Sequence, residues 1–298
     1  MTADSTDRLT AARRLEFALA CLAHGDCAAA AEAARAATEA DPALPEAWFV
    51  LGEASQRAGD AMAAAAAYRC YLEAEPGDRL GAEVRLAILG AAPTPAQLPT
   101  AYLRALYQEY APRFEQSLTE GLAYRGPALI DQALGERRFA RTLELGCGTG
   151  LLGPVLRPRA AQLEGVDLSP AMLARARRRG LYDALHEAEA LAFLAAAPAD
   201  TWDLVAAADL LPYLGDLAPV LAGITRVLTT GGRVVLTLER HDGAEDYLLA
   251  PTQRFRHAAR YVLGLVQALG LAVERLDPVV TRQEAGQPVP GLLLVASK

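Results

Sequence analysis

The sequence lacks the residue spacings that bind a structural metal or build a disulfide framework. It contains four cysteines and four histidines in 298 residues. No two cysteines form a CxxC pair, and His24, His186, His241 and His257 are scattered along the chain. Because zinc sites and disulfide-rich domains need closely spaced Cys and His side chains, we expect neither, and no metal site.

A surplus of basic residues and a long apolar run are also missing. The chain has 29 Lys and Arg against 36 Asp and Glu, a formal net charge of −7. This balance disfavours a non-specific hold on nucleic-acid phosphates. The N-terminal residues 1–7 are polar and acidic, unlike a signal peptide, and no run of membrane-spanning length follows. We expect a cytoplasmic protein that binds neither nucleic acid nor membrane.

Apolar residues, by contrast, are abundant. They make up 52% of the chain and charged residues 22%, a composition typical of a folded protein with a substantial core. The length favours two domains rather than one.

An internal repeat occupies the first ninety residues. Gly25-Asp26 recurs as Gly59-Asp60, and Pro42 recurs as Pro76, in both cases 34 residues later. This is the period of the tetratricopeptide (TPR) repeat, a pair of antiparallel helices. In the second unit, small residues at Gly52 and Ala64 allow close helix contact, with Trp48 and Tyr68 around it. We expect a TPR-like module over residues 1–92, ending in a capping helix at 79–90. It serves either as a packing or dimerisation element or as a peptide-docking groove.

A short proline-rich stretch separates this module from the rest of the chain. Pro93, Pro95 and Pro99 disfavour helix, so residues 93–100 are predicted to be an extended linker. Residues 101–135 then show helical spacing of apolar side chains, with a break at Pro112. We predict that 101–135 form a helical lid on a second domain spanning 101–298.

Glycines at alternate positions follow the first strand pattern of this second domain. The run Leu143–Gly150 places Gly146, Gly148 and Gly150 before a helical segment, where absent side chains let a ligand approach the backbone. The spacing is Gly-x-Gly-x-Gly and not the Gly-x-Gly-x-x-Gly of dinucleotide sites, which disfavours a nicotinamide oxidoreductase. Asp167 ends the next strand, where a carboxylate can accept both hydroxyls of a ribose.

The remaining patterns alternate strands and helices, as in a parallel sheet with crossovers. Strands are predicted at 201–209 and 233–239, with a helix at 216–229 between them. A last helix is predicted at about 254–269. Two final strands, near 272–277 and 290–296, are expected to pair as a hairpin.

Three motifs together resemble class I S-adenosylmethionine-dependent methyltransferases. They are Leu143-Glu-Leu-Gly-Cys-Gly-Thr-Gly, Gly165-Val-Asp-Leu-Ser-Pro-Ala-Met and Leu228-Thr-Thr-Gly-Gly-Arg-Val-Val-Leu. The resemblance covers residues 101–298, and with the repeats in front the chain is similar to bacterial predicted methyltransferases that contain TPR repeats. It implies an α/β fold, a Rossmann-like sheet of seven strands behind an all-α TPR module. The implied cofactor is S-adenosyl-L-methionine, which becomes S-adenosyl-L-homocysteine.

The resemblance also implies roles for individual residues. Glu144 would lie near the amino acid end of the cofactor, the three glycines under its methionine part, and Asp167 on the ribose. Glu187 stands where many members carry an Asp beside the adenine, and Glu189 is the alternative. The complete set of expected cofactor-binding residues is Tyr107, Glu144, Gly146, Gly148, Gly150, Asp167, Leu168, Glu187, Ala188 and Asp209.

The acceptor side is assigned from residue chemistry. A hydroxyl or amine acceptor needs a base, whereas a carboxylate or thiolate does not; the candidate catalytic bases are Asp209, His241 and His257. The candidate substrate-binding residues are Tyr110, Arg113, Tyr213, Glu239, Arg254 and His257. Arg254 would suit an anionic acceptor, and a helix would place it on one face with His257.

These observations predict a methyltransferase that acts on a small, anionic molecule. The alternatives are a methyltransferase of a protein partner docked by the repeats, and a catalytically idle cofactor-binding adaptor.

Overall fold

The computed structural model describes residues 5–298 and divides into two compact units between Pro95 and Ala96. This division falls inside the segment predicted to be a linker. Residues 1–4 of the predicted N-terminal module lie outside the described part of the chain.

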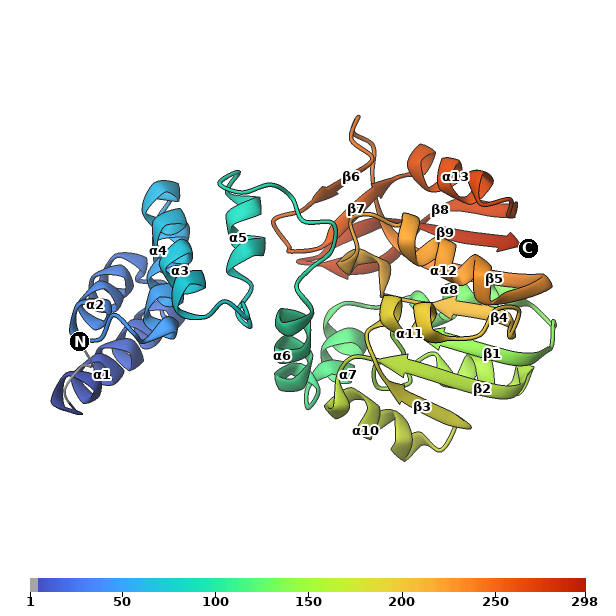
Figure 1. Ribbon diagram of the computed structural model, residues 1–298, viewed down its shortest axis with the longest axis horizontal. Coiled ribbons are helices and arrows are strands. Elements are labelled where there is room, and N and C mark those ends of the chain that lie inside the picture. Colours follow the sequence, from blue (N-terminus) through green and yellow to red (C-terminus); the bar gives the residue numbers. More distant parts are fainter. Residues whose placement is uncertain (1–4) are drawn as a thin grey trace. The chain divides into compact units, whose positions relative to one another are not determined.

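The first unit consists of helices (Figure 1). They are α1 Ser5–Ala23, α2 Cys27–Ala40, α3 Pro45–Arg57, α4 Ala61–Ala74 and α5 Ala82–Ile88. The turns that connect the helices of each pair reproduce the repeat seen in the sequence. Gly25 and Gly59 both have positive φ, and the Asp26 and Asp60 side chains accept from the backbone N–H of Ala29 and Ala63. These are helix N-caps, so α1–α2 and α3–α4 form two equivalent helix pairs.

Close packing within the second pair depends on Gly52. A Cβ at this position would come within 2.6 Å of the Tyr68 ring, which is itself fully buried. The predicted capping helix is shorter than 79–90, because the Asp78 carboxylate caps it by accepting from the N–H groups of Ala82 and Glu83.

The second unit is a sheet flanked by helices. Its helices are α6 Thr100–Tyr110, α7 Phe114–Gln116, η1 Ser117–Gly121, α8 Gly126–Leu134, α9 Gly153–Leu156, η2 Arg157–Arg159, α10 Pro170–Arg179, α11 Ala190–Ala196, η3 Leu211–Tyr213, α12 Ala218–Val227 and α13 Ala259–Ala268. Its strands are β1 Phe139–Leu145, β2 Ala160–Asp167, β3 Ala184–Glu187, β4 Trp202–Ala207, β5 Leu228–His241, β6 Tyr247–Leu249, β7 Phe255–Ala258, β8 Ala272–Glu284 and β9 Gln287–Ser297.

Nine strands form one mixed sheet in the described residues, two more than the seven predicted. Five parallel strands run in the order β3-β2-β1-β4-β5. Antiparallel β9 pairs with β5, and β8 pairs with β9 in the predicted hairpin. The additional strands, β6 and β7, join the C-terminal end of β5 through Arg240 and His241. Neither strand was predicted from the sequence, because each has only three or four residues.

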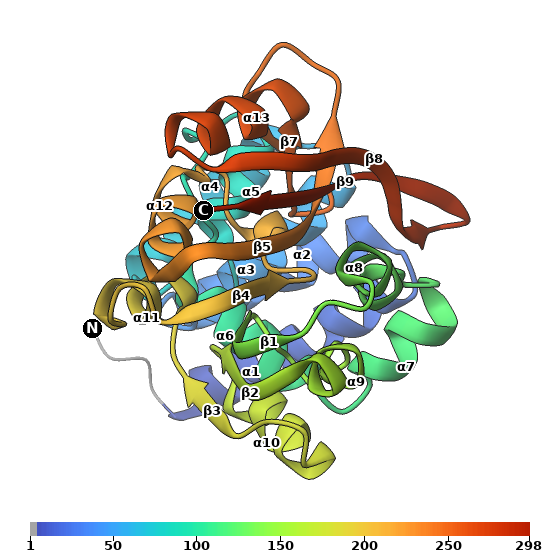
Figure 2. The same cartoon turned by 90° about the vertical axis from the view of Figure 1, so that its right-hand side faces the viewer.

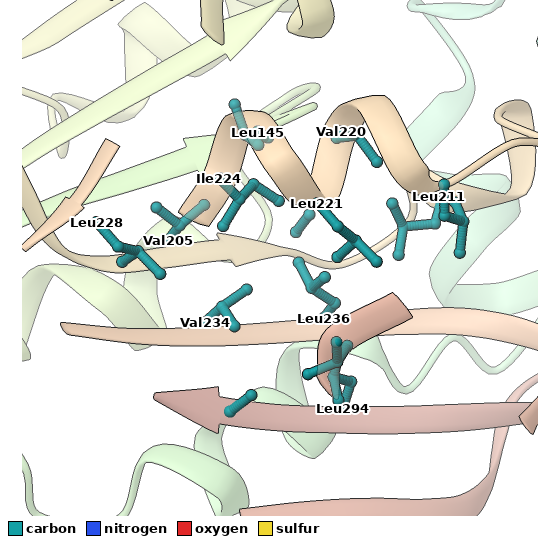
Figure 3. Close-up of a cluster of buried hydrophobic side chains, with 14 of the residues drawn as sticks. Leu145, Val205, Leu211, Val220, Leu221, Ile224, Leu228, Val234, Leu236 and Leu294 are labelled. Atoms are coloured by element: carbon teal, nitrogen blue, oxygen red, sulfur yellow. The ribbon is translucent and has the colours of Figure 1, made fainter. Parts of the chain in front are cut away.

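Helices cover both faces of the sheet, with α11, α12 and α13 on one face and α8 and α9 on the other (Figure 2). Figure 3 shows Leu221 and Ile224 of α12 directed at the strands, in a buried apolar cluster that also contains Val220. On the opposite face, Leu129 and Ile130 of α8 pack against the sheet. The predicted lid 101–135 is therefore corrected, because its last helix belongs to the core.

Two further predictions are corrected by the fold. The stretch predicted as a helix from 254 begins as strand β7, and the helix starts at Ala259. The predicted linker is in part built into the second unit. Ala96 accepts from the N–H groups of Gly215 and Asp216, and the N–H of Leu98 donates to the Tyr213 carbonyl.

Candidate active site

The carboxyl ends of the parallel strands meet where the strand order reverses, between β1 and β4. Gly146 follows β1, Asp167 ends β2, and Asp209 lies two residues beyond β4. In open α/β sheets the crevice at such a reversal is the usual ligand site. The sheet topology thus brings together residues that are 63 positions apart in the chain, from Gly146 to Asp209.

The carboxylate of Asp167 fixes the loop after β1 by hydrogen bonds to the backbone. It accepts from the N–H of Gly148 and from the N–H of Ser169, each at 2.8 Å. Gly146 and Gly148 both have positive φ, and a Cβ at Gly148 would point toward the Phe114 ring at 3.8 Å. Burial raises the pKa of Asp167. Each carboxylate oxygen retains a lone pair for a second donor, such as a ribose hydroxyl.

A pocket of about 810 Å³, counted with its open mouth, lies over this loop; we call it the Asp167 pocket. Its lining is largely apolar, with carboxylates at three points. The residues are Gln97, Leu98, Thr100, Leu103, Tyr107, Phe114, Gly146, Gly148, Val166, Asp167, Leu168, Met172, Ala188, Glu189, Ala190, Asp209, Leu210, Tyr213 and Leu214. A concave, mostly apolar site with a few polar groups is typical of small-ligand binding.

A smaller pocket continues beyond Phe114 and is lined by Glu144, Gly146, Gly148 and Asp209 among others. The Tyr182 hydroxyl donates to the Glu144 carboxyl at 2.7 Å. Burial raises the pKa of Glu144 to about 8, although the Tyr182 hydrogen bond acts in the opposite sense. Glu144 therefore retains its proton at neutral pH unless a positive charge binds beside it.

Arg254 is the centre of a buried cluster of charges beside the Asp167 pocket. Its guanidinium donates to Asp209 at 2.5 Å, to the Tyr213 hydroxyl at 2.6 Å, and to Glu239. Glu239 also accepts from Arg282 at 2.5 Å. Burial alone would raise the pKa of Glu239, but Arg254 and Arg282 outweigh it and lower the pKa. Arg254 is thus matched by two carboxylates and is not a free cation.

Two hydroxyl groups meet at the edge of the pocket. The Tyr107 hydroxyl from α6 is hydrogen-bonded to the Tyr213 hydroxyl from η3, and their rings are perpendicular at 5.7 Å. Tyr213 also lies under the Arg254 guanidinium, 5.0 Å from the ring centroid. Helix α6 is therefore connected to the charge cluster through Tyr213.

Most of the predicted cofactor residues meet in the two pockets. Gly150 does not: a Cβ there would come within 3.0 Å of the Tyr182 ring, outside both linings. Glu187 is also corrected, because its carboxylate pairs with Arg104 at 3.0 Å while Glu189 lines the Asp167 pocket.

The two histidines predicted as bases lie away from the Asp167 pocket. His257 is fully buried in β7, and its Nε2 donates to the carbonyls of Leu214 and Gly215 at 2.8 and 3.2 Å. Burial lowers the pKa of His257 to about 4, so the ring is neutral and structural. The Nδ1 of His241 accepts from the N–H of Gly243 at 3.1 Å. Of the three predicted bases, Asp209 is the one that lines the pocket.

Three residues predicted to bind substrate also lie outside the Asp167 pocket. Glu239 is 1% exposed and its Oε1 accepts from Arg254 and Arg282, so a substrate does not reach it. Arg113 is an exposed residue paired with Glu109 at 3.7 Å. Tyr110 packs on Phe114 and lines a separate pocket together with Tyr213 and Arg254.

Sequence reasoning missed several lining residues. Gln97 and Leu98 carry no local signal, since they stand in a proline-rich stretch read as a linker. Met172 stands at the end of one of the resembling motifs but was given no role.

Within residues 5–298, no group of three or more His, Cys, Asp or Glu side chains is placed to hold a metal ion. In the same residues, no helix combines the length and apolarity needed to span a membrane.

Residues 143–234 match the family described as a methyltransferase domain. A stretch of 85 residues is 44% identical to Methyltransferase-like protein 27 of Homo sapiens, covering 26% of this chain and 34% of that protein. A stretch of 109 residues is 31% identical to the ubiquinone biosynthesis O-methyltransferase of Xanthomonas oryzae pv. oryzae (strain PXO99A), covering 35% and 46%. The chain thus spans a third to a half of the length of these curated relatives.

The fold is also found among solved structures. The 1,6-didemethyltoxoflavin-N1-methyltransferase of Burkholderia thailandensis, solved with its substrate and S-adenosylhomocysteine, has a TM-score of 0.52 at 17% identity. The similarity covers 70% of this chain and 93% of that one. These findings support S-adenosylmethionine as the cofactor, and the second unit has the α/β fold of the solved methyltransferase, with the methyltransferase-domain match over residues 143–234.

Proposed function

We propose that this protein transfers a methyl group from S-adenosylmethionine to a small molecule. The observation that carries the proposal is the carboxylate of Asp167, oriented by two backbone N–H groups at the mouth of a glycine loop. When bound, the cofactor supplies a methyl group that its sulfonium has already activated. The chain then has to align the acceptor, exclude water and, for a hydroxyl or amine acceptor, take up a proton.

The lining residues divide these tasks. Asp167 would hold the ribose hydroxyls, and Glu189 would face the adenine in place of Glu187. Leu168 and Met172 supply apolar surface for the base. Glu144 and the loop glycines would hold the amino acid end, in the smaller pocket.

Asp209 is the candidate base for an acceptor that must lose a proton. It lines both pockets, and burial raises its pKa, although the Arg254 guanidinium opposes that effect. A carboxylate whose pKa lies above its usual range is a better proton acceptor near neutral pH.

Two alternatives rest on the N-terminal helices. Their 34-residue repeat supports a TPR-like module, which would present a protein substrate or make the chain a cofactor-binding adaptor.

Calorimetry with S-adenosylhomocysteine and NAD tests the cofactor assignment, and tighter NAD binding would contradict it. A second experiment incubates the full chain with methyl-labelled S-adenosylmethionine and a cell extract, and it distinguishes the three candidate functions by where the label goes. Label in the small-molecule fraction supports the proposal, label in the protein fraction supports protein methylation, and cofactor binding without transfer supports the adaptor.

A further inference from the structure

A third pocket lies on the far side of the Tyr107–Tyr213 pair; we call it the tyrosine pocket. It measures about 600 Å³ with its open mouth. Four of its lining residues are tyrosines, namely Tyr102, Tyr107, Tyr110 and Tyr213, and three are consecutive in the chain, namely Thr252, Gln253 and Arg254. It shares Leu98, Tyr107 and Tyr213 with the Asp167 pocket, so these three side chains form the wall between the two.

The polar atoms of this lining are largely engaged within the protein. The Tyr102 hydroxyl donates to the Gln253 amide oxygen at 2.6 Å, and the Tyr107 and Tyr213 hydroxyls bond to each other. The rings and two leucines, Leu98 and Leu106, therefore make up most of what a ligand would touch. Aromatic walls of this kind favour a planar aromatic ligand, which can stack or make edge contacts.

The charge of the pocket is balanced before any ligand binds. The one guanidinium in the lining, Arg254, is held by Asp209 and Glu239. A ligand carboxylate at the remaining N–H groups of Arg254 would lie close to these two carboxylates, and their repulsion would offset much of the attraction to the guanidinium. The pocket therefore offers a full negative charge little net attraction.

The wall between the pockets is formed in part by α6, none of whose residues is fully buried. The polar contacts of this helix include Arg104 with Glu187, Tyr102 with Gln253 and Tyr107 with Tyr213. Separation of the last pair would connect the tyrosine pocket to the methyl-donor side. Gln253, which accepts from Tyr102, adopts a left-handed backbone (φ 59°) directly before Arg254.

We propose that the tyrosine pocket binds the methyl acceptor and that the acceptor is an uncharged aromatic ring, such as a phenol or an aromatic amine. This inference rests on the proposed methyltransferase function and replaces the anionic acceptor that the sequence suggested.

The test is ligand-observed saturation-transfer NMR on the full chain with bound S-adenosylhomocysteine. Three probes of similar size separate the claims: catechol, cyclohexane-1,2-diol and 3,4-dihydroxybenzoate. We expect catechol to bind more tightly than the saturated diol, which lacks the ring, and more tightly than the dihydroxybenzoate, which adds a carboxylate. Equal binding of the first two, or preference for the carboxylate, would overturn the proposal.

Two variants of one residue locate the binding. Tyr110→Leu removes a ring of the pocket, whereas Tyr110→Phe keeps it. We expect catechol to bind roughly two- to tenfold more weakly to the Leu variant, the range of an aromatic contact of about 0.5–1.5 kcal/mol, and nearly normally to the Phe variant. Equal catechol affinity of the two variants would show that the ring binds elsewhere.

Calorimetry of S-adenosylhomocysteine with the native chain and the two Tyr110 variants distinguishes failure of the acceptor proposal from failure of the proposed methyltransferase function. If the cofactor product binds and catechol does not, the acceptor proposal is wrong while the proposed function stands. If the cofactor product fails to bind to the native chain, the proposed function itself fails.

Discussion

The carboxylate of Asp209 and the guanidinium of Arg254 are joined at 2.5 Å, although 45 residues separate them in the chain. Asp209 follows β4, and Arg254 precedes β7, one of the two additional short strands. Asp209 lines the Asp167 pocket and Arg254 lines the tyrosine pocket. The pair therefore connects the proposed cofactor and acceptor sites, and Asp209 offsets part of the positive charge that Arg254 presents to the tyrosine pocket.

Replacing Asp209 by Asn should leave cofactor binding largely intact and slow methyl transfer. The amide can still accept a hydrogen bond from Arg254 but cannot take up a proton, and the loss of a general base costs about 10²–10⁴ in rate. The initial rate of label transfer to the small-molecule extract measures this effect, with S-adenosylhomocysteine calorimetry as the control for folding. A native rate in the Asn variant would show that the acceptor needs no base from Asp209.

Asp167→Ala should weaken cofactor binding without unfolding the unit. The variant loses a charged acceptor for two ribose hydroxyls, and a hydrogen bond to a charged group contributes about 1.5–3 kcal/mol. We expect roughly ten- to hundredfold weaker binding of S-adenosylhomocysteine by calorimetry. Asp242→Asn, at a side chain that is 79% exposed, is the matched control. Equal affinities of the two variants would refute the ribose assignment.

Glu144 should make the native protein less stable as pH rises. The pKa of this carboxyl is about 8 in the folded state, against a usual value of 4.5. The folded state therefore keeps a proton that the unfolded state has released, so the free energy of unfolding falls between these two pH values and levels off above about 8. Each pH unit in this window removes at most about 1.4 kcal/mol.

Urea unfolding of the native chain and Glu144→Gln across this window tests the assignment. The Gln variant should lose this part of the pH dependence, whereas Glu245→Gln, at an exposed position, should retain it. A native-like slope in Glu144→Gln would mean that another group causes the effect.

Glu239→Gln should be strongly destabilising. The change leaves the guanidinium groups of Arg254 and Arg282 with one partner fewer in a buried site, and breaking a buried ion pair costs about 3–5 kcal/mol. Glu284→Gln is the control, because this carboxylate is 39% exposed and pairs with Arg282 from the surface; exposed pairs contribute about 0–1 kcal/mol. Similar unfolding free energies for both variants would show that the cluster does not stabilise the fold.

Local sequence determined the loop and the order of the elements. The open loop at Gly146 and Gly148 was predictable because its backbone conformation requires glycine at those positions. The position of Asp167 was predictable because it directly follows the apolar run of a strand. The alternation of strands and helices was also readable, because its hydrophobic period is local. The short strands β6 and β7 were not, since three or four residues carry too little periodic pattern.

Only the tertiary structure decided which charged side chains are free. From the sequence alone, Arg254 was an available cation, Glu239 a substrate contact and His257 a base; burial and long-range pairing assign all three to the framework. The choice between Glu187 and Glu189 also depends on tertiary structure, because Arg104 of α6 pairs with Glu187, whereas Glu189 lines the Asp167 pocket and caps α11 by accepting from the N–H of Ala192. A residue type specifies which chemistry a side chain can do, but partners distant in the chain determine its solvation, its charge and its access to a ligand.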